Sequence, residues 1–221
     1  RDKLVTGVQT CALPISKTDA KGIVATYSYD SANRLTAIAF PDPKDNVAYS
    51  YDSCTNGKGR LCSMTDPAGT TTYDYTIKGQ LSKETRTIDS TSFVTQYSYD
   101  KNGNTTSITY PSGRIISYGY TNDKVTQLLS NGAALATSIT YKPFGNIQSL
   151  IFGNGIKQTN SYDQQYRLTQ INTQGIQNLA YTYDKNSNIT QITDNLDNTK
   201  TKAYGYGTQD RLTTATGPWG S

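Results

Sequence analysis

A short unit containing two tyrosines recurs through almost the whole chain and restricts what the chain can fold into. Its clearest copy reads YSYDKNGN at residues 97–104. The second tyrosine of each copy serves as a marker, and the markers are Tyr29, Tyr51, Tyr75, Tyr99, Tyr120, Tyr141, Tyr162, Tyr183 and Tyr206. Successive markers are 22, 24, 24, 21, 21, 21, 21 and 23 residues apart. A period this regular predicts an array of similar structural units.

Other positions recur around each marker. A further tyrosine stands two residues before it at Tyr27, Tyr49, Tyr73, Tyr97, Tyr118, Tyr181 and Tyr204. An aspartate follows it directly at Asp30, Asp52, Asp100, Asp163 and Asp184. In the clearest copy Gly103 comes four residues after the marker. A polar residue five positions after the marker and aliphatic residues six and nine after it are frequent in the other copies.

The unit has the pattern of a β-hairpin. Two tyrosines separated by one residue lie on the same face of a strand, and tyrosine favours strands. The aspartate and the glycine or asparagine that follow are turn residues, because their side chains or backbones suit tight turns. The aliphatic and threonine-rich segment after the turn is then the return strand. Its aliphatic positions are three residues apart, so either both faces of the sheet are partly covered or a β-bulge intervenes.

Composition agrees with an all-β fold. Apolar residues make up only 34% of the chain, and the net charge is only +4. The 18 tyrosines supply the burial area that aliphatic residues do not. Glu84 is the only glutamate beside sixteen aspartates, and this bias favours turns over helices. We therefore expect tandem β-hairpins forming a curved, spiralling antiparallel sheet.

The first residues do not follow the repeat. Residues 5–15 read VTGVQTCALPI, which resembles the translation of a common sequencing adapter. We interpret residues 1–16 as a leader that is not native, residues 17–216 as about nine repeats, and residues 217–221 as a truncated end. The natural N-terminus is then missing, so the lack of a signal peptide says nothing about secretion.

The second copy of the unit carries an insertion with two cysteines. The insertion reads CTNGKGRLC at residues 54–62. If Cys54 and Cys62 face each other on paired strands, a disulfide can close this short loop. Two free thiols packed in the sheet are the alternative.

The sequence contains no pattern typical of a catalytic or cofactor-binding site. The chain has no histidine, so it offers neither a Ser/His nor a Cys/His pair. Its dispersed aspartates are explained by turns, and a metal site is not expected. The GNG at residues 153–155 lacks a third glycine and a following helix, so it is not a nucleotide-binding loop. We expect no enzymatic activity, no cofactor and, because the basic residues are scattered, no nucleic-acid partner. No apolar run is long enough for a membrane helix.

The repeated pattern Y-x-Y-D-x-x-G-[RN]-L-x-x-I resembles the YD repeat of the Rhs family. This family includes Rhs toxins, C components of insecticidal toxin complexes, bacterial wall-associated proteins and animal teneurins. The resemblance covers roughly residues 22–215. It implies a long sheet of hairpins wound into a hollow shell, which in bacterial toxins encloses a variable C-terminal toxic domain.

One family feature does not match. Shells of this kind end in a segment with an Asp-Pro-x-Gly-Leu motif at which the chain cuts itself. The nearest match is DPAG at residues 66–69, but Thr70 replaces the leucine and repeats continue on both sides. We interpret these residues as a turn between two repeats.

Two functions remain open. In the first, the chain is a structural stretch of shell wall whose partners are neighbouring repeats and an enclosed toxin domain. In the second, it is an adhesion module that binds carbohydrate or a cell-surface partner through exposed polar and aromatic residues. The resemblance implies a secreted or cell-surface bacterial protein in both cases.

Overall fold

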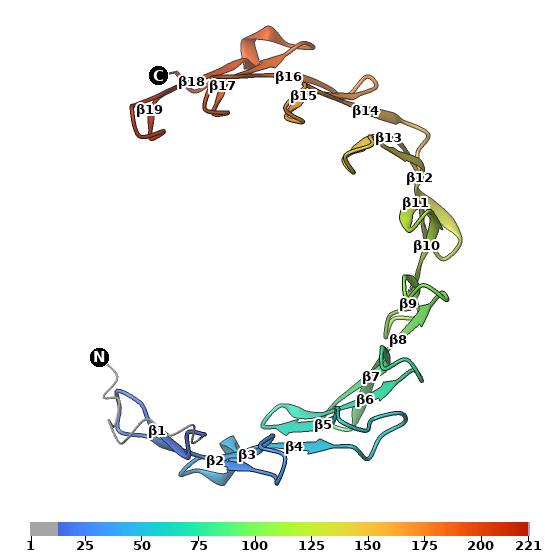
Figure 1. The fold of residues 1–221 in the computed structure, drawn as a ribbon, viewed down its shortest axis with the longest axis vertical. Coiled ribbons are helices and arrows are strands. Elements are labelled where there is room, and N and C mark those ends of the chain that lie inside the picture. The colour runs from blue at the N-terminus through green and yellow to red at the C-terminus, as the bar shows by residue number, and fades with distance from the viewer. Residues whose placement is uncertain (1–12, 221) are drawn as a thin grey trace. The chain divides into compact units, whose positions relative to one another are not determined.

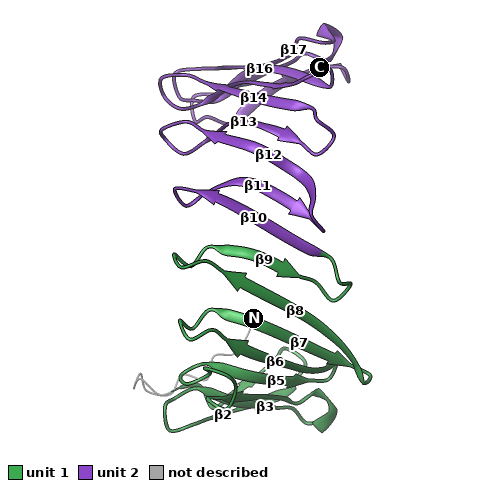
Figure 2. Cartoon of the chain, turned by 90° about the vertical axis from the view of Figure 1, so that its right-hand side faces the viewer, with its two compact units in different colours: residues 1–114 green, residues 115–221 purple. Residues whose placement is uncertain are grey.

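The computed structural model describes residues 13–220, and the chain separates into two compact units between Arg114 and Ile115. Each unit is a single layer of antiparallel strands, as Figure 2 shows. Within the described residues the only helical segments are two short 3-10 turns, η1 (Pro43–Asp45) and η2 (Asn198–Lys200). The prediction of an all-β chain of antiparallel hairpins is confirmed.

The first unit contains nine of the described strands, and each pairs with the next along the chain (Figure 1). They are β1 (Ser16–Thr18), β2 (Val24–Tyr29), β3 (Leu35–Ala39), β4 (Val47–Tyr51), β5 (Leu61–Asp66), β6 (Gly69–Tyr75), β7 (Leu81–Ile88), β8 (Thr91–Tyr99) and β9 (Thr105–Thr109).

The second unit continues the pattern with ten strands among its described residues, again paired in chain order. They are β10 (Ile115–Thr121), β11 (Lys124–Ser130), β12 (Ala133–Tyr141), β13 (Ile147–Phe152), β14 (Lys157–Tyr162), β15 (Leu168–Thr173), β16 (Gln177–Tyr183), β17 (Ile189–Asp194), β18 (Lys202–Tyr206) and β19 (Leu212–Thr216).

A β-bulge at the same place in each hairpin explains the three-residue spacing of the aliphatic positions. In the clearest copy Tyr99 pairs with Thr105 and Tyr97 pairs with Ile108, and the register shifts between Ser98 and Tyr99. The return strand therefore holds one extra residue between its two pairing positions. Residues directly opposite in an antiparallel pair share a face, so both partners lie on the side of the tyrosines. The same shift occurs before the other marker tyrosines.

The register divides each sheet into two chemically different faces. The tyrosine face carries both tyrosines of each repeat and their aliphatic partners, such as Leu168 opposite Tyr162 and Ile192 opposite Tyr181. The other face, here called the hydroxyl face, carries mainly serine, threonine and alanine. Few side chains within residues 13–220 are buried, among them Ala25, Cys62, Thr71, Ile116 and Thr173. A single layer this thin depends on contacts between neighbouring repeats.

Residues 66–69 form the predicted turn between two repeats. Asp66 pairs with Gly69, so β5 and β6 are joined by a tight hairpin loop. The Asp66 Oδ1 accepts a hydrogen bond from the Ala68 backbone amide at 2.9 Å and another from the Arg86 guanidinium at 2.7 Å. The interpretation of this segment as a turn is confirmed.

The N-terminal leader lies mostly outside the described residues. Of residues 5–15, only the last three are described. The Tyr29 hydroxyl donates a hydrogen bond to the Pro14 carbonyl at 2.9 Å, and β1 pairs with β2. The boundary between leader and repeats at residue 16 stays a prediction.

Candidate functional site

Seven of the marker tyrosines join their repeat to the one before it. The Tyr183 hydroxyl donates a hydrogen bond to the Leu168 backbone carbonyl at 2.7 Å. The equivalent bonds run from Tyr51 to Leu35 (2.8 Å), Tyr75 to Leu61 (2.6 Å), Tyr99 to Leu81 (2.7 Å), Tyr141 to Val125 (2.7 Å), Tyr162 to Ile147 (2.8 Å) and Tyr206 to Ile189 (3.0 Å). The phenol thus serves both as strand side chain and as a link between hairpins.

The acceptor in each case is a backbone carbonyl at the start of a return strand. At this position the return strand is not yet paired with the first strand of the next repeat. The ladder between β15 and β16 starts with Gln170 opposite Ala180, two residues beyond Leu168. A half-buried carbonyl at such a position would lack a strand partner, and leaving it unpaired costs free energy. The hydroxyl of Tyr183 supplies the missing donor.

The aspartate after the marker organises the turn. The Asp30 Oδ1 accepts hydrogen bonds from the backbone amides of Ala32 and Arg34, both at 2.9 Å. Its Oδ2 accepts one from the Arg34 Nε at 2.7 Å. The same arrangement holds Asp100 with Asn104, Asp163 with Arg167, and Asp184 with Asn188. The recurring polar residue five positions after the marker is therefore the side-chain partner of the turn aspartate.

In two repeats that polar residue is an arginine whose side chain also reaches the next repeat. The Arg34 guanidinium lies 4.5 Å from the centre of the Tyr51 ring and donates to both carboxylate oxygens of Asp52, at 3.0 and 2.6 Å. The Arg167 guanidinium lies 4.6 Å from the Tyr183 ring centre. One cation thus binds the turn of its own repeat and stacks on the tyrosine of the next.

These contacts shift the pKa values of the groups involved. Hydrogen bonds from the Arg34 side chain, with a further one from the Gly59 amide, lower the pKa of Asp52 to about 2. The Arg34 backbone amide and guanidinium lower the pKa of Asp30, and its two carboxylate partners, Asp52 first, raise the pKa of Arg34 itself. The Asn188 side-chain amide lowers the pKa of Asp184. All of these shifts favour the charged, bonded state.

Burial acts in the opposite sense on the tyrosines of the tyrosine face. It raises the pKa of Tyr73, Tyr75, Tyr97, Tyr99, Tyr181 and Tyr183. These phenols stay protonated, so the hydroxyls of the markers Tyr75, Tyr99 and Tyr183 can act as the hydrogen-bond donors that the contacts between repeats require.

The insertion of the second repeat lies against the third repeat. Cys54 and Cys62 are joined as a disulfide with Cα atoms 5.3 Å apart. The Thr55 carbonyl accepts a hydrogen bond from the Tyr75 backbone amide at 3.0 Å. The Asn56 side-chain amide donates to the Tyr75 carbonyl at 2.7 Å. The insertion is therefore a contact between repeats and not a free loop.

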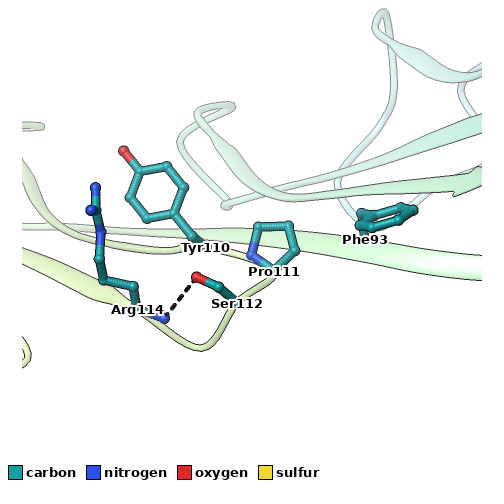
Figure 3. Close-up of a pocket in the computed structure, with 5 residues that line it drawn as sticks. All are labelled: Phe93, Tyr110, Pro111, Ser112 and Arg114. Carbon is teal, nitrogen blue, oxygen red and sulfur yellow. Dashed lines mark hydrogen bonds between the residues drawn. The ribbon is translucent and has the colours of Figure 1, made fainter.

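Two shallow grooves lie on the described part of the chain. The first, of about 540 Å³, is lined by Phe93 of β8 and by Tyr110, Pro111, Ser112 and Arg114 after β9 (Figure 3). The Arg114 guanidinium lies 5.3 Å from the Tyr110 ring centre, and the two side chains extend in the same direction. The second groove, of about 370 Å³, is lined by Gln177, Leu179, Ile192, Asp194, Lys200, Lys202 and Pro218.

Neither groove contains a catalytic constellation. Across residues 13–220 no three metal-ligating side chains gather at one place. The described helical turns are also far too short to cross a membrane.

The residues singled out from the sequence fall at equivalent places in each hairpin. The tyrosine pairs lie at the end of the first strand of their repeats, namely Tyr27 and Tyr29, Tyr49 and Tyr51, Tyr73 and Tyr75, Tyr97 and Tyr99, Tyr181 and Tyr183, and Tyr204 and Tyr206; the pair Tyr118 and Tyr120 comes one residue before the end of β10. Tyr141 and Tyr162 end β12 and β14. Asp30, Asp52, Asp100, Asp163 and Asp184 start the turns, and Gly103 has a positive φ of 94°.

Sequence reasoning missed two parts of the site. It found the polar residue five positions after the marker without assigning it to the turn aspartate. It also gave no acceptor for the tyrosine hydroxyl, because that acceptor is a backbone carbonyl. The recurrence of an aspartate with an arginine or asparagine four residues later, as in Asp30 and Arg34, was the available signal for the first.

Comparison with known proteins agrees with the repeat pattern. The RHS Repeat family profile matches residues 13–43, 79–115 and 99–133. No curated protein matches the chain.

Solved structures show the same fold. A crystal structure of TcdB2–TccC3 matches with a TM-score of 0.80 and 20% identity over 92% of this chain and 13% of that chain. The Photorhabdus luminescens Tc holotoxin pore with the TccC3 mutation D651A matches with a TM-score of 0.79 and 20% identity, over 92% of this chain and 12% of that chain. The chain thus spans about an eighth of the length of these structures. The repeat pattern and the fold agree with the RHS Repeat profile, and the chain carries RHS repeats within the matched residues 13–43 and 79–133.

Proposed function

We propose that the chain is a segment of an Rhs/YD-repeat shell wall that encloses a C-terminal toxin domain and helps to deliver it. The observation that carries the proposal is the use of the recurring side chains. The marker hydroxyls, turn aspartates and stacked arginines are engaged with their own or a neighbouring repeat. A surface built this way serves to extend and close a wall rather than to carry out chemistry.

The structural neighbours support the second part of the proposal. One of them is described as TcdB2–TccC3 without its hypervariable C-terminal region, and another as a toxin pore. By analogy, the parent of this chain carries a variable domain beyond its repeats. The wall then separates that domain from the medium until delivery, in competition between bacteria or against a host.

We propose no enzymatic activity for this segment and a secreted or cell-surface location for its parent protein. The aspartates, which are its main acidic groups, act as turn acceptors. A disulfide between Cys54 and Cys62 fits an oxidising compartment. A hydrolase activity abolished by one aspartate substitution would contradict the first statement.

The test uses the full-length parent protein recovered by long-read sequencing of its gene. Limited proteolysis with mass spectrometry would follow the C-terminal domain in the wild type and in a Tyr99→Phe/Tyr183→Phe variant. We expect the domain to be protected in the wild type and cut faster in the variant. A Tyr97→Phe/Tyr181→Phe protein, altered on the same strands, is the matched control. A parent without a domain after its repeats, or a domain equally accessible in all three proteins, would refute enclosure.

Adhesion to carbohydrate or a surface partner is the second candidate, and the groove at Phe93 and Tyr110 is the observation that favours it. Phe93 is 44% exposed and lies beside an aromatic, a proline and an arginine. Aromatic faces of this kind can stack on sugar rings. Binding on a glycan array that is lost in a Phe93→Ala/Tyr110→Ala variant would support this role, and its absence would leave the wall as the function.

A further inference from the structure

The insertion of the second repeat makes one contact between repeats unlike the others. The segment of residues 52–60, here called the clasp, extends from the end of β4 to the start of β5 and lies beside the end of β6. We propose that the Cys54–Cys62 bond is a site of reversible thiol–disulfide exchange that controls how tightly the second and third repeats are joined. This inference concerns one contact within the chain and does not rest on the proposed shell function.

The clasp binds the last residue of β6 from the outside. Tyr75 already pairs with Leu81 of the neighbouring strand within its own hairpin. On its other side the Tyr75 amide donates to the Thr55 carbonyl at 3.0 Å, and its carbonyl accepts from Asn56 Nδ2 at 2.7 Å. The Tyr75 hydroxyl donates to Leu61 at 2.6 Å. Tyr75 is thus held by the clasp at its amide and carbonyl, in addition to the hydroxyl bond seen in other repeats.

A second set of bonds extends the contact to the turn of the third repeat. The Arg60 Nε donates to the Gly79 carbonyl at 3.2 Å, and the Arg60 guanidinium lies 5.6 Å from the Tyr75 ring centre. The Thr55 amide donates to Asp74 Oδ1 at 3.3 Å. On the clasp side, both residues that make these contacts, Thr55 and Arg60, lie within the loop that the disulfide closes.

The shape of the clasp depends on the disulfide. The Gly57 amide donates to the Cys54 carbonyl at 3.0 Å, and the Arg60 amide donates to the Gly57 carbonyl at 2.8 Å. Gly57 is buried, and a Cβ atom on it would lie only 2.2 Å from the Cys54 sulfur and 2.5 Å from the Cys62 sulfur. The backbone of the clasp therefore packs directly on the two sulfur atoms.

The two sulfur atoms differ in solvent exposure, and this determines which one an incoming thiolate attacks and which one leaves. Cys62 is 4% exposed, whereas Cys54 is only half-buried. The Cys54 backbone amide donates to the Cys62 Sγ at 3.0 Å. A hydrogen-bond donor at this distance stabilises a thiolate, and a stabilised thiolate is the better leaving group.

The reductant is a dithiol, either a small molecule or a thioredoxin-like protein. Its thiolate attacks the Cys54 Sγ, the bond between the two cysteines breaks, and its electron pair leaves on the Cys62 sulfur, which then takes up a proton. The second thiolate of the reductant attacks the mixed disulfide and releases Cys54 as a thiolate, which is also protonated. Two electrons and two protons reach the cysteines, and the dithiol becomes a disulfide.

Reduction frees a nine-residue loop from its constraint. The chain entropy that the cross-link removes is regained, so the clasp leaves Tyr75 more often. For a loop of this length we expect the Tyr75 amide to open and exchange about 10 to 100 times faster. The effect should be confined to the end of β6, because the loop that the disulfide closes contacts the third repeat, whereas the bond between Arg34 of the first repeat and Asp52 lies outside that loop.

The test is amide hydrogen exchange on the whole chain, carried in a Cys11→Ser background so that only these two cysteines remain. Oxidised protein is compared with protein reduced by dithiothreitol, with thiol titration to verify reduction. Faster exchange at Tyr75, with β14 to β17 unchanged, supports the proposal. Unchanged exchange at Tyr75 after complete reduction overturns it, and so does an equal rise in every strand.

Two variants keep the result independent of the reductant. A Cys54→Ser/Cys62→Ser protein should show the fast exchange of the reduced state in the absence of dithiothreitol. Asn56→Ala removes a bond of the clasp while leaving the disulfide in place, and it should raise exchange at Tyr75 to a smaller extent. A double serine variant with the slow exchange of the oxidised protein would refute the role of the disulfide.

Discussion

The hydroxyl of Tyr183 donates a hydrogen bond to the backbone carbonyl of Leu168 across 2.7 Å, and the two residues belong to different repeats. Tyr181, two residues earlier on the same strand and face, has a phenol without a hydrogen-bond partner within residues 13–220. The two tyrosines of one motif therefore have different structural roles. The first packs on Ile192 of its own hairpin, and the second ties that hairpin to its neighbour.

Replacing Tyr183 by phenylalanine tests this difference. The change keeps the ring and leaves the Leu168 carbonyl without its donor. We expect the free energy of unfolding to fall by about 1 kcal/mol, the usual contribution of one such bond. Urea denaturation followed by circular dichroism measures it. Tyr181→Phe is the control and should change stability by less than half as much; equal losses would contradict the separate roles.

The residue four positions after each marker gives a second prediction. This position has positive φ in several repeats, with a glycine at Gly103 (94°) but a serine at Ser187 (71°). A left-handed conformation costs a non-glycine residue about 1 kcal/mol. Ser187→Gly should therefore raise the melting temperature, although it removes an exposed bond to Arg167 at 3.2 Å.

The reciprocal change serves as its control. Gly103→Ser places a side chain where φ favours glycine, and it should lower stability by about 1–2 kcal/mol. Calorimetry on both variants checks the pair. Two shifts of the same sign would show that backbone conformation does not govern this position.

The ion pair between Arg34 and Asp52 predicts a loss of stability in acid. The Arg34 side chain lowers the pKa of Asp52 from 3.8 to about 2. A carboxyl group whose pKa is lower in the folded state contributes stability above its unfolded pKa and loses it as pH falls through the folded value. The contact between the first two repeats should therefore weaken between about pH 4 and pH 2.

Carbon-detected NMR of the carboxyl groups, alongside urea unfolding at each pH, measures this weakening. An Asp52→Asn variant should be less stable than the wild type at pH 7 and should lose less stability than it on acidification. If the two proteins show the same dependence below pH 4, the ion pair does not carry the effect.

Arg86 gives a fourth prediction. Its guanidinium donates to the buried Thr71 hydroxyl at 2.8 Å and to Asp66 at 2.7 Å. Arg86→Leu leaves both acceptors without this donor, and we expect a loss of about 1–2 kcal/mol in denaturant unfolding. Lys83→Leu, on the opposite face of the same strand, is the control and should change stability by no more than about 0.5 kcal/mol.

The final strand predicts self-association. Among the described strands, β19 pairs only with β18, so its outer edge is open. An open edge recruits other chains, and lysine on an edge strand opposes this. The chain should form oligomers in light scattering, and Thr214→Lys/Thr216→Lys should reduce their size. A monodisperse wild-type monomer would contradict this expectation.

Much of the hairpin could be predicted from the sequence because its signals are local. The spacing of Tyr97 and Tyr99 assigns both rings to one face, and the aspartate and glycine that follow specify a turn. The bulge remained one of two alternatives, since the spacing of Thr105 and Ile108 fits either a regular strand with both faces partly covered or a bulged strand. Only the register of the paired strands resolves it.

The contacts between repeats could not be predicted from the sequence, for a different reason. The Leu168 carbonyl and the Thr55 carbonyl are backbone atoms, and every residue has one. Which of them meets a tyrosine depends on where strand pairing begins and on the path of a loop through space. Nothing in the letters of the insertion at residues 54–62 indicates that it binds the next repeat rather than projecting into solvent.

The repeat also limits how such a chain can change in length. Duplication or loss of a whole hairpin preserves each tyrosine bond, since it reaches only the adjacent hairpin. Deletion of Thr106 alone would remove the bulge and leave Thr105 and Ile108 two positions apart, which keeps both on the tyrosine face. Deletion of Ser98 would instead make Tyr97 and Tyr99 adjacent and turn one of them to the hydroxyl face. Gene variants that gain or lose complete repeats should therefore yield folded protein, whereas a single-codon deletion between paired tyrosines should not.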